Sequence, residues 1–273
     1  MAKSALLKSS LAKKYWMALT GLFLCLFLSG HLAGNLQLLV PDNALNFNKY
    51  ALFMTTNPAV KLLSYLTYIS ILFHAIDGLM LAFQNKAARP VAYAMNAPQK
   101  NSTWSSRNMA VLGTVVLVFI VTHMVNFWAK MHFSEMPLQK TTIEISGMKQ
   151  DFYLTTDGGY VPANDPNYIV KNKTEIFDKN ANIKIKEGYK DLYKITIEFF
   201  KDSQFGLVFT LLYVLSMMVL AFHLLHGFQS AFQSLGLNNP KYTPLIKGFG
   251  KGFAIVVPLL FAIIPVYIHF FLK

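Results

Sequence analysis

The stretch HAIDGLMLAFQ, residues 74–84, returns later in the chain as HLLHGFQSAFQ, residues 223–233. Both copies place His, Gly, Ala, Phe and Gln at the same offsets. The apolar segments that precede the copies correspond as well, because one set of residues has the same spacing as the other: Ala18, Gly21, Phe27 and His31 against Ala110, Gly113, Phe119 and His123. The sequence therefore predicts a duplicated unit of two helices, with one histidine in each helix.

Long uncharged runs indicate that these helices lie in a membrane. The chain has 273 residues and is 54% hydrophobic. Five stretches are long enough to cross roughly 30 Å of hydrocarbon, and they cover residues 15–40, 59–84, 106–131, 205–235 and 246–271. Each must be a helix, because lipid-exposed backbone has to satisfy its own hydrogen bonds. We therefore predict an all-α membrane protein, one domain over residues 1–273, with a long insertion at 132–204.

The first span follows Lys3, Lys8, Lys13 and Lys14 and so resembles a cleaved signal peptide. It is too long for the apolar region of a signal peptide, and it carries a histidine of the repeat. We therefore expect it to remain in the mature protein.

Basic residues predict the orientation. The N-terminus, the loop 85–105 with Arg107, and the turn 236–251 carry eleven Lys and Arg and no acid, whereas the short opposite loop has only Lys49, Lys61 and Asp42. By the positive-inside rule the N-terminus lies in the cytoplasm and Lys273 outside. The insertion 132–204 is then extracytoplasmic, although loops of this length are exempt from the rule. The basic face can hold anionic lipid or dock an acidic partner.

Six of the seven histidines fall within predicted spans, where an ionisable group is costly and usually has a function. One isolated buried histidine is more often a hydrogen-bonded structural residue, but four in a repeat favour a shared ligand. Pairs of neutral imidazoles in an apolar bundle suit the two axial faces of a haem iron. The only cysteine is Cys25 and no C-x-x-C-H occurs, which excludes a covalent c-type haem.

Depth predicts which histidines pair. At about 1.5 Å of rise per residue, His31 and His123 lie roughly 24 and 26 Å from the cytoplasmic ends of their spans. His74 and His223 lie roughly 15 and 18 Å from those ends. We therefore expect an outer pair, His31 with His123, and an inner pair, His74 with His223. The symmetry of the repeat predicts the same pairs.

The arrangement of the histidines also bears on other metals and other ligands. Structural zinc needs four N or S ligands close together, whereas these histidines divide into two layers. Glycines on the spans leave room for a flat macrocycle, although close helix packing explains them equally well; they are Gly21, Gly78, Gly113 and Gly227. His226 lies one turn from His223 and competes with it, but the repeat favours His223.

Asp77 occupies the place in the first copy that His226 occupies in the second. An acid at this depth is expected to have a partner. We predict that Asp77 and His226 line the cytoplasmic edge of the inner haem pocket, bonded to each other or to a haem propionate; the alternative is that Asp77 reaches interfacial water. His132 and His269 have no counterpart in the repeat and are expected at the interface.

The segments GLFLCLFLSGH, LFHAIDGLMLAF, GTVVLVFIVTH and FHLLHGFQSAFQSLG lie in the first four of the five predicted spans. In a chain with five spans in this order, they resemble the dihaem cytochrome b anchor of succinate:quinone oxidoreductases and quinol:fumarate reductases. The resemblance covers all five helices. It implies two haem b groups with axial ligands at His31, His74, His123 and His223. It also implies a flavoprotein and an iron–sulfur subunit on the cytoplasmic side of a bacterial inner membrane, and a quinone as substrate. The dicarboxylate chemistry would then belong to another chain of the respiratory complex.

Two features depart from that family. The insertion 132–204 is far longer than expected. Its composition predicts turns and short strands, and it either covers the outer haem or decorates the exterior. Some dihaem fumarate reductases place a proton-carrying Glu two residues before the fourth-helix histidine, where this chain has Ala221. Proton transfer by that route is therefore in doubt.

Two rival functions share part of this pattern. The cytochrome b subunit of a hydrogenase, formate dehydrogenase or nitrate reductase would hold similar haems beside a different soluble partner. A haem-free transporter could also be built from repeats. The sequence leaves open the direction of turnover, menaquinone or ubiquinone as the quinone, and its binding site, for which the polar candidates are Asn35, Gln37, Asn126 and the segment 46–50.

Overall fold

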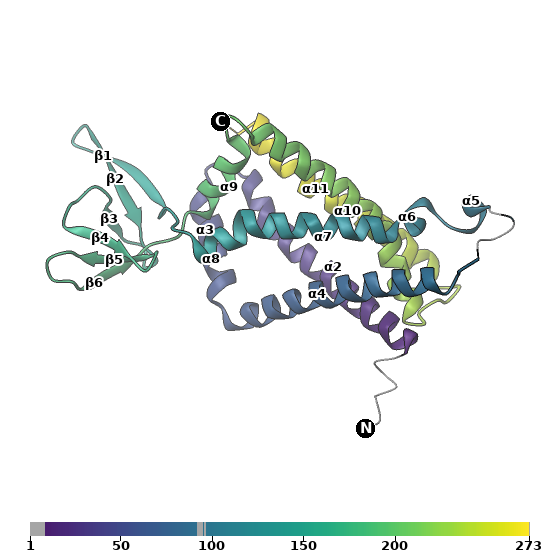
Figure 1. Cartoon of the computed structure of the whole chain (residues 1–273). Coiled ribbons are helices and arrows are strands. Elements are labelled where there is room, and N and C mark those ends of the chain that lie inside the picture. Colours follow the sequence, from purple (N-terminus) through teal and green to yellow (C-terminus); the bar gives the residue numbers. More distant parts are fainter. Residues whose placement is uncertain (1–8, 92–94, 96, 273) are drawn as a thin grey trace, which may run out of the picture.

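The computed structural model describes residues 9–91, 95 and 97–272 (Figure 1). Lys3, Lys8 and Lys273, which helped to predict the orientation in the membrane, lie outside the described residues. Within these described residues, five helical segments are long and apolar enough to cross a membrane, as predicted. They are Leu11–Leu39, Pro58–Ala87, Met109–Phe133, Gly206–Ser234 and Thr243–Phe270.

These segments are built from named helices. The first contains α2 (Ser10–Asn35) and the short 3-10 helix η1 (Leu36–Leu39). The second is α4 (Pro58–Ala87), and the third runs through α7 (Met109–His123), the π-helix η2 (Met124–Ala129) and α8 (Lys130–Phe133). The last two are α10 (Gly206–Ser234) and α11 (Thr243–Phe270). Helix α2 packs against α4 and α10, and α10 also packs against α7 and α11.

The two ends of the bundle differ in kind (Figure 1). One end, which we call the basic end, holds the start of α2, the short helices α5 (Pro98–Asn101) and α6 (Trp104–Arg107), and the turn between α10 and α11. The other, the cap end, holds α3 (Ala44–Thr56), α9 (Leu192–Lys201) and two small β-sheets.

The insertion after α8 forms the cap, which we define as residues 134–191. Six strands make two antiparallel sheets, in the order β1-β2-β3 and β4-β5-β6. Their bounds are Lys140–Ile145, Met148–Leu154, Tyr160–Pro162, Tyr168–Lys171, Glu175–Asp178 and Lys184–Glu187. The helices expected in the spans and the short strands expected in this insertion are both present, so the all-α class describes the spans alone. Its short β-branched and aromatic runs, separated by turn residues, are typical of strands.

The cap has a small core of its own. Leu138, Val161 and Ile176 are buried together, with Tyr153 and Tyr168 packed against them. Such a cluster is small for a free-standing unit, so contacts with the helices are needed to fix the cap in place.

Two lysines of the cap bind the end of the third span. Lys173 Nζ donates to the carbonyl of His132 at 2.8 Å, and Lys190 Nζ donates to that of Met131 at 3.0 Å. Cations stabilise a helix at its C-terminal end, where the last carbonyls lack partners within the helix. Burial, followed by repulsion from Lys173, lowers the pKa of Lys190.

A buried polar network joins the cap to α3. Asn48, which is 2% exposed, donates to Gln139 Oε1 at 3.2 Å and to Asp191 Oδ1 at 2.9 Å. Its own Oδ1 accepts from the backbone N–H of Tyr193 at 3.0 Å, and Asp191 also accepts from the N–H of Lys194 as the N-cap of α9. All hydrogen-bonding atoms of the Asn48 amide are thus directed at the junction between the cap and α9.

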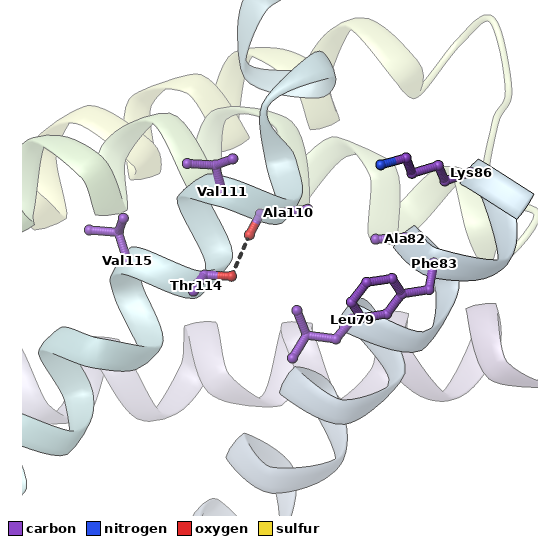
Figure 2. Close-up of a pocket in the computed structure, with 8 residues that line it drawn as sticks. All are labelled: Leu79, Ala82, Phe83, Lys86, Ala110, Val111, Thr114 and Val115. Carbon is purple, nitrogen blue, oxygen red and sulfur yellow. Dashed lines mark hydrogen bonds between the residues drawn. The ribbon is translucent and has the colours of Figure 1, made fainter.

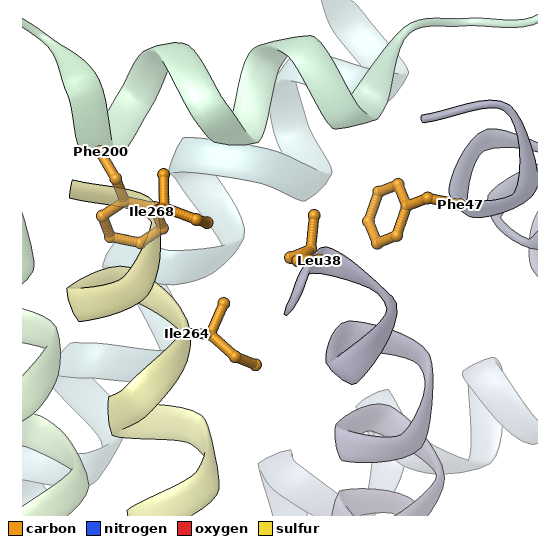
Figure 3. Packing of buried hydrophobic residues seen from close by; sticks show 5 residues of the cluster. All are labelled: Leu38, Phe47, Phe200, Ile264 and Ile268. Atoms are coloured by element: carbon orange, nitrogen blue, oxygen red, sulfur yellow. The ribbon is translucent and has the colours of Figure 1, made fainter. Parts of the chain in front are cut away.

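Apolar packing closes the bundle at the cap end. Figure 3 shows five buried side chains from η1, α3, α9 and α11 meeting at one point: Leu38, Phe47, Phe200, Ile264 and Ile268. Helices α3 and α9 therefore lie across the ends of the spans and pack against them.

Candidate metal centres

The outer pair joins α2 and the C-terminal end of α7. The ring centroids of His31 and His123 are 5.8 Å apart, and the ring planes cross at 82°. Both side chains lie within the bundle and are largely shielded from its surface. Phenylalanines surround this pair, and the rings that contact it are Phe27, Phe119, Phe127 and Phe261.

The inner pair joins α4 and α10, nearer the basic end. The ring centroids of His74 and His223 are 6.3 Å apart, and the planes cross at 70°. The structure thus brings together the two pairs that depth and repeat symmetry predicted. His226 makes no ring contact with His74 in the described part of the chain, so His223 is the residue that faces it.

Both separations fit two imidazoles on opposite sides of one metal ion. Metal–imidazole bonds of about 2 Å place the ring centroids about 6 Å apart. Edge-to-face packing of aromatic rings gives similar distances. The cost of burying ionisable side chains in a membrane favours the metal, because packing alone would be served by apolar rings.

Two glycines that correspond in the repeat leave room for the inner imidazoles, one beside each ring. A Cβ at Gly21 of α2 would lie 3.1 Å from His74 Cε1, and one at Gly113 of α7 would lie 3.4 Å from His223 Cε1. These glycines correspond in the repeat, as the two histidines do. Gly78 faces open space and Gly227 faces the methyl group of Met109.

The two inner histidines have different partners. His74 Nδ1 lies 3.3 Å from both the Met17 carbonyl and Thr20 Oγ1. His223 Nδ1 is buried and has no hydrogen-bond partner among the described residues. Leu112 stands in the repeat where Thr20 stands in the first copy, which explains the missing hydroxyl.

The two outer histidines also differ. His123 Nδ1 lies 3.5 Å from the hydroxyl of Tyr213, which accepts from Asn126 Nδ2 at 3.4 Å. His31 Nδ1 lies 3.4 Å from the amide nitrogen of Asn35, and this amide donates to the His31 carbonyl at 2.8 Å.

The remaining candidates occupy separate places. Asp77 and His226 are half-buried, and among the described residues no hydrogen bond or ion pair joins them. Of the two predicted alternatives, a direct bond between them is absent from this structure, and contact with a haem propionate stays a prediction. His132 stacks on Trp128, and His269 Nδ1 lies 2.6 Å from the Phe200 carbonyl, which ties the end of α11 to α9.

A groove of about 470 Å³ lies between α4 and α7, on the side of the inner pair that faces the basic end (Figure 2). Its lining is apolar except for Lys86 and Thr114, and the Thr114 hydroxyl is bonded to its own helix at Ala110. Ala110 and Thr114 flank Gly113, which contacts His223. Helices α4 and α7 thus leave lateral space next to the inner pair.

A four-ligand zinc site finds no support in this geometry. No group of three or more His, Cys, Asp or Glu side chains comes together within the described ranges. Among the described residues, the candidate metal ligands are therefore pairs of histidines and not clusters of three or more side chains.

The sequence did not indicate which protein groups contact the nitrogens of the paired histidines. Thr20, the Met17 carbonyl and Tyr213 contact imidazole nitrogens. Thr20 could have been found as a polar residue where the repeat has Leu112. No feature of the repeat marks Tyr213, since it reaches His123 only through the packing of α10 on α7.

Comparison with known protein families, with curated proteins and with solved structures finds no match.

Proposed function

We propose that this chain is a membrane cytochrome b that holds two haem b groups, one at the outer pair and one at the inner pair. The observation that carries the proposal is that a duplicated helix pair presents four histidines as two facing pairs, each with centroids close to 6 Å apart. Haem b, when bound, supplies one-electron redox chemistry. The chain's own residues would ligate it, orient it and exclude water.

The more specific proposal is the anchor subunit of a succinate:quinone oxidoreductase or quinol:fumarate reductase, supported by the resemblance of the spans. In that role the basic end faces the cytoplasm and docks an iron–sulfur subunit that is paired with a flavoprotein. The exposed lysines at this end suit an acidic partner; they include Lys86, Lys241, Lys247 and Lys251.

Haem content and copurification test the two levels of the proposal separately. The untagged complex is purified in mild detergent, haem is quantified as the pyridine haemochrome, and the copurified subunits are identified. We expect two haem b per chain, a covalently flavinylated or flavin-containing subunit, and dicarboxylate-dependent quinone reduction. If two haems are found but the copurified subunit belongs to a hydrogenase, formate dehydrogenase or nitrate reductase, the cytochrome b proposal stands and the proposed partner is wrong. A colourless protein would contradict both levels.

Docking at the basic end has its own test. Replacing Lys86, Lys247 and Lys251 together by Gln should release the soluble subunits at lower salt than in the wild type, because exposed charges are screened over about 10 Å at 0.1 M salt. Lys140, Lys149 and Lys179 of the cap provide a control triple substitution with the same change of charge. Equal release curves for all three proteins would assign the basic end to lipid instead.

A further inference from the structure

Tyr213 brings a phenolic hydroxyl to one ligand of the outer pair. This oxygen lies 3.5 Å from His123 Nδ1 and accepts a hydrogen bond from Asn126 at 3.4 Å. The ring is half-buried and is held on several sides by aromatic neighbours, namely Phe119, Phe127, Phe199 and Phe200. The hydroxyl is thus fixed in position by packing from α7, η2 and α9.

The π-helix η2 explains how Asn126 reaches this oxygen. It begins at Met124, directly after His123. A π turn contains one residue more than an α turn, so the side chains that follow are rotated relative to a continuous α-helix; such turns often occur at functional sites. Asn126 is the polar residue of η2, and its amide is directed at Tyr213 instead of at lipid.

Within the outer pair, the oxygen contact is specific to one ligand. His31 Nδ1 faces the nitrogen of the Asn35 amide, which is itself a donor. A metal-bound imidazole that coordinates through Nε2 carries its proton on Nδ1 and needs an acceptor there. Tyr213 offers one, because a hydroxyl oxygen can accept from both His123 and Asn126.

Resting on the proposed function, we infer that Tyr213 is a positioning residue that tunes the outer haem through His123, with Asn126 holding its hydroxyl in place. An acceptor at Nδ1 fixes the ring orientation and increases the electron donation of the ligand. The N–H of a ligand to ferric iron is the stronger donor, so the hydrogen bond favours the oxidised state. Loss of the acceptor should therefore raise the midpoint potential of the outer haem.

The competing explanation is that Tyr213 only fills space among the phenylalanines. Tyr213→Phe distinguishes the two, since it keeps the ring and removes only the hydroxyl. If the hydroxyl acts on His123, the reduction equilibrium of the outer haem should change about threefold, as expected of one neutral hydrogen bond, or roughly 30 mV for a one-electron couple. The inner haem should keep its potential. If the ring only packs, neither potential should move.

The experiment is a redox titration of the purified full-length protein, followed by the α-band of each haem. The outer component is identified as the one lost in His123→Ala. Asn126→Ala is the second variant and should shift the same component in the same direction, because the hydroxyl then loses its anchor. Tyr68→Phe is the matched control, since its hydroxyl accepts from Trp128 Nε1 at 2.9 Å without any contact to a histidine of either pair.

The outcomes separate this inference from the proposed function. An upward shift of the outer component alone in Tyr213→Phe, with two haems per chain, supports it. Two haems with unchanged potentials in Tyr213→Phe and Asn126→Ala overturn it and leave the proposed function intact. An equal shift in Tyr68→Phe also overturns it, because the effect would not depend on contact with His123. A wild type without haem overturns the proposed function itself.

Discussion

The inner and outer histidine pairs are built by different means, although they come from the same duplicated unit. At the inner pair, glycines on α2 and α7 let the helices approach the imidazoles, and His74 faces a backbone carbonyl and a threonine. At the outer pair, phenylalanines surround the rings, and a tyrosine from α10 faces His123. The difference teaches that duplication preserved the histidines while each site acquired its own surroundings.

The largest expected effect comes from removing a ligand. Either His74→Ala or His223→Ala should abolish the inner haem and leave the outer one, because in the proposed function each pair would provide both protein ligands of one haem. His226→Ala should retain both, since His223 is the residue that faces His74. Pyridine haemochrome analysis should show a fall from two haems to one per chain in the first two variants. Loss of a haem in His226→Ala with retention in His223→Ala would reverse the assignment.

A smaller effect is expected from filling the space beside the inner pair. Gly21→Val places methyl groups where even a Cβ would lie 3.1 Å from His74, so the imidazole must move. We expect reduced occupancy of the inner haem and normal occupancy of the outer one. Gly30→Ala on the same helix is the control, because nothing lies within 4 Å of its added Cβ. Equal haem spectra in both variants would show that Gly21 serves helix packing only.

A third prediction concerns the polar network that attaches the cap at the outer end of the bundle. Asn48→Ala leaves Gln139 and Asp191 without their shared partner, at a cost of about 1–3 kcal/mol for a buried unsatisfied group. The cap should then be cleaved faster by protease, whereas the inner haem keeps its spectrum. Asn46→Ala on the same helix is the control, since Asn46 is exposed and its side chain bonds only to Asn43 among the described residues. Equal cleavage of the two variants would show that the network does not hold the cap.

The smallest effect is expected at Asp77, which lies three residues from His74 and therefore on nearly the same face of α4. Asp77→Asn removes a negative charge that would favour the oxidised inner haem, so its midpoint potential should rise by some tens of millivolts. The outer haem is farther away and should not respond. Redox titration of both components gives the answer, and unchanged potentials would mean that the inner iron feels no charge at Asp77.

Periodicity and repetition were enough to predict the membrane part. The five apolar runs specified five helices, because a spanning segment has to satisfy its own backbone and the length of a helix is fixed by its rise per residue. The repeat specified which four histidines correspond, and depth along the spans predicted their pairing. These features are local or follow from symmetry, so they can be taken from the order of residues.

Tertiary structure alone decided what surrounds each imidazole and how the cap is attached. Tyr213 and His123 lie far apart in the sequence and meet only because α10 packs on α7, with a π turn setting the direction of Asn126. Asn48 likewise finds Gln139 and Asp191 only after the cap has folded. Side-chain contacts between distant segments depend on helix rotation and packing, and a pattern of hydrophobic residues fixes the buried face without fixing the atom that each polar group meets.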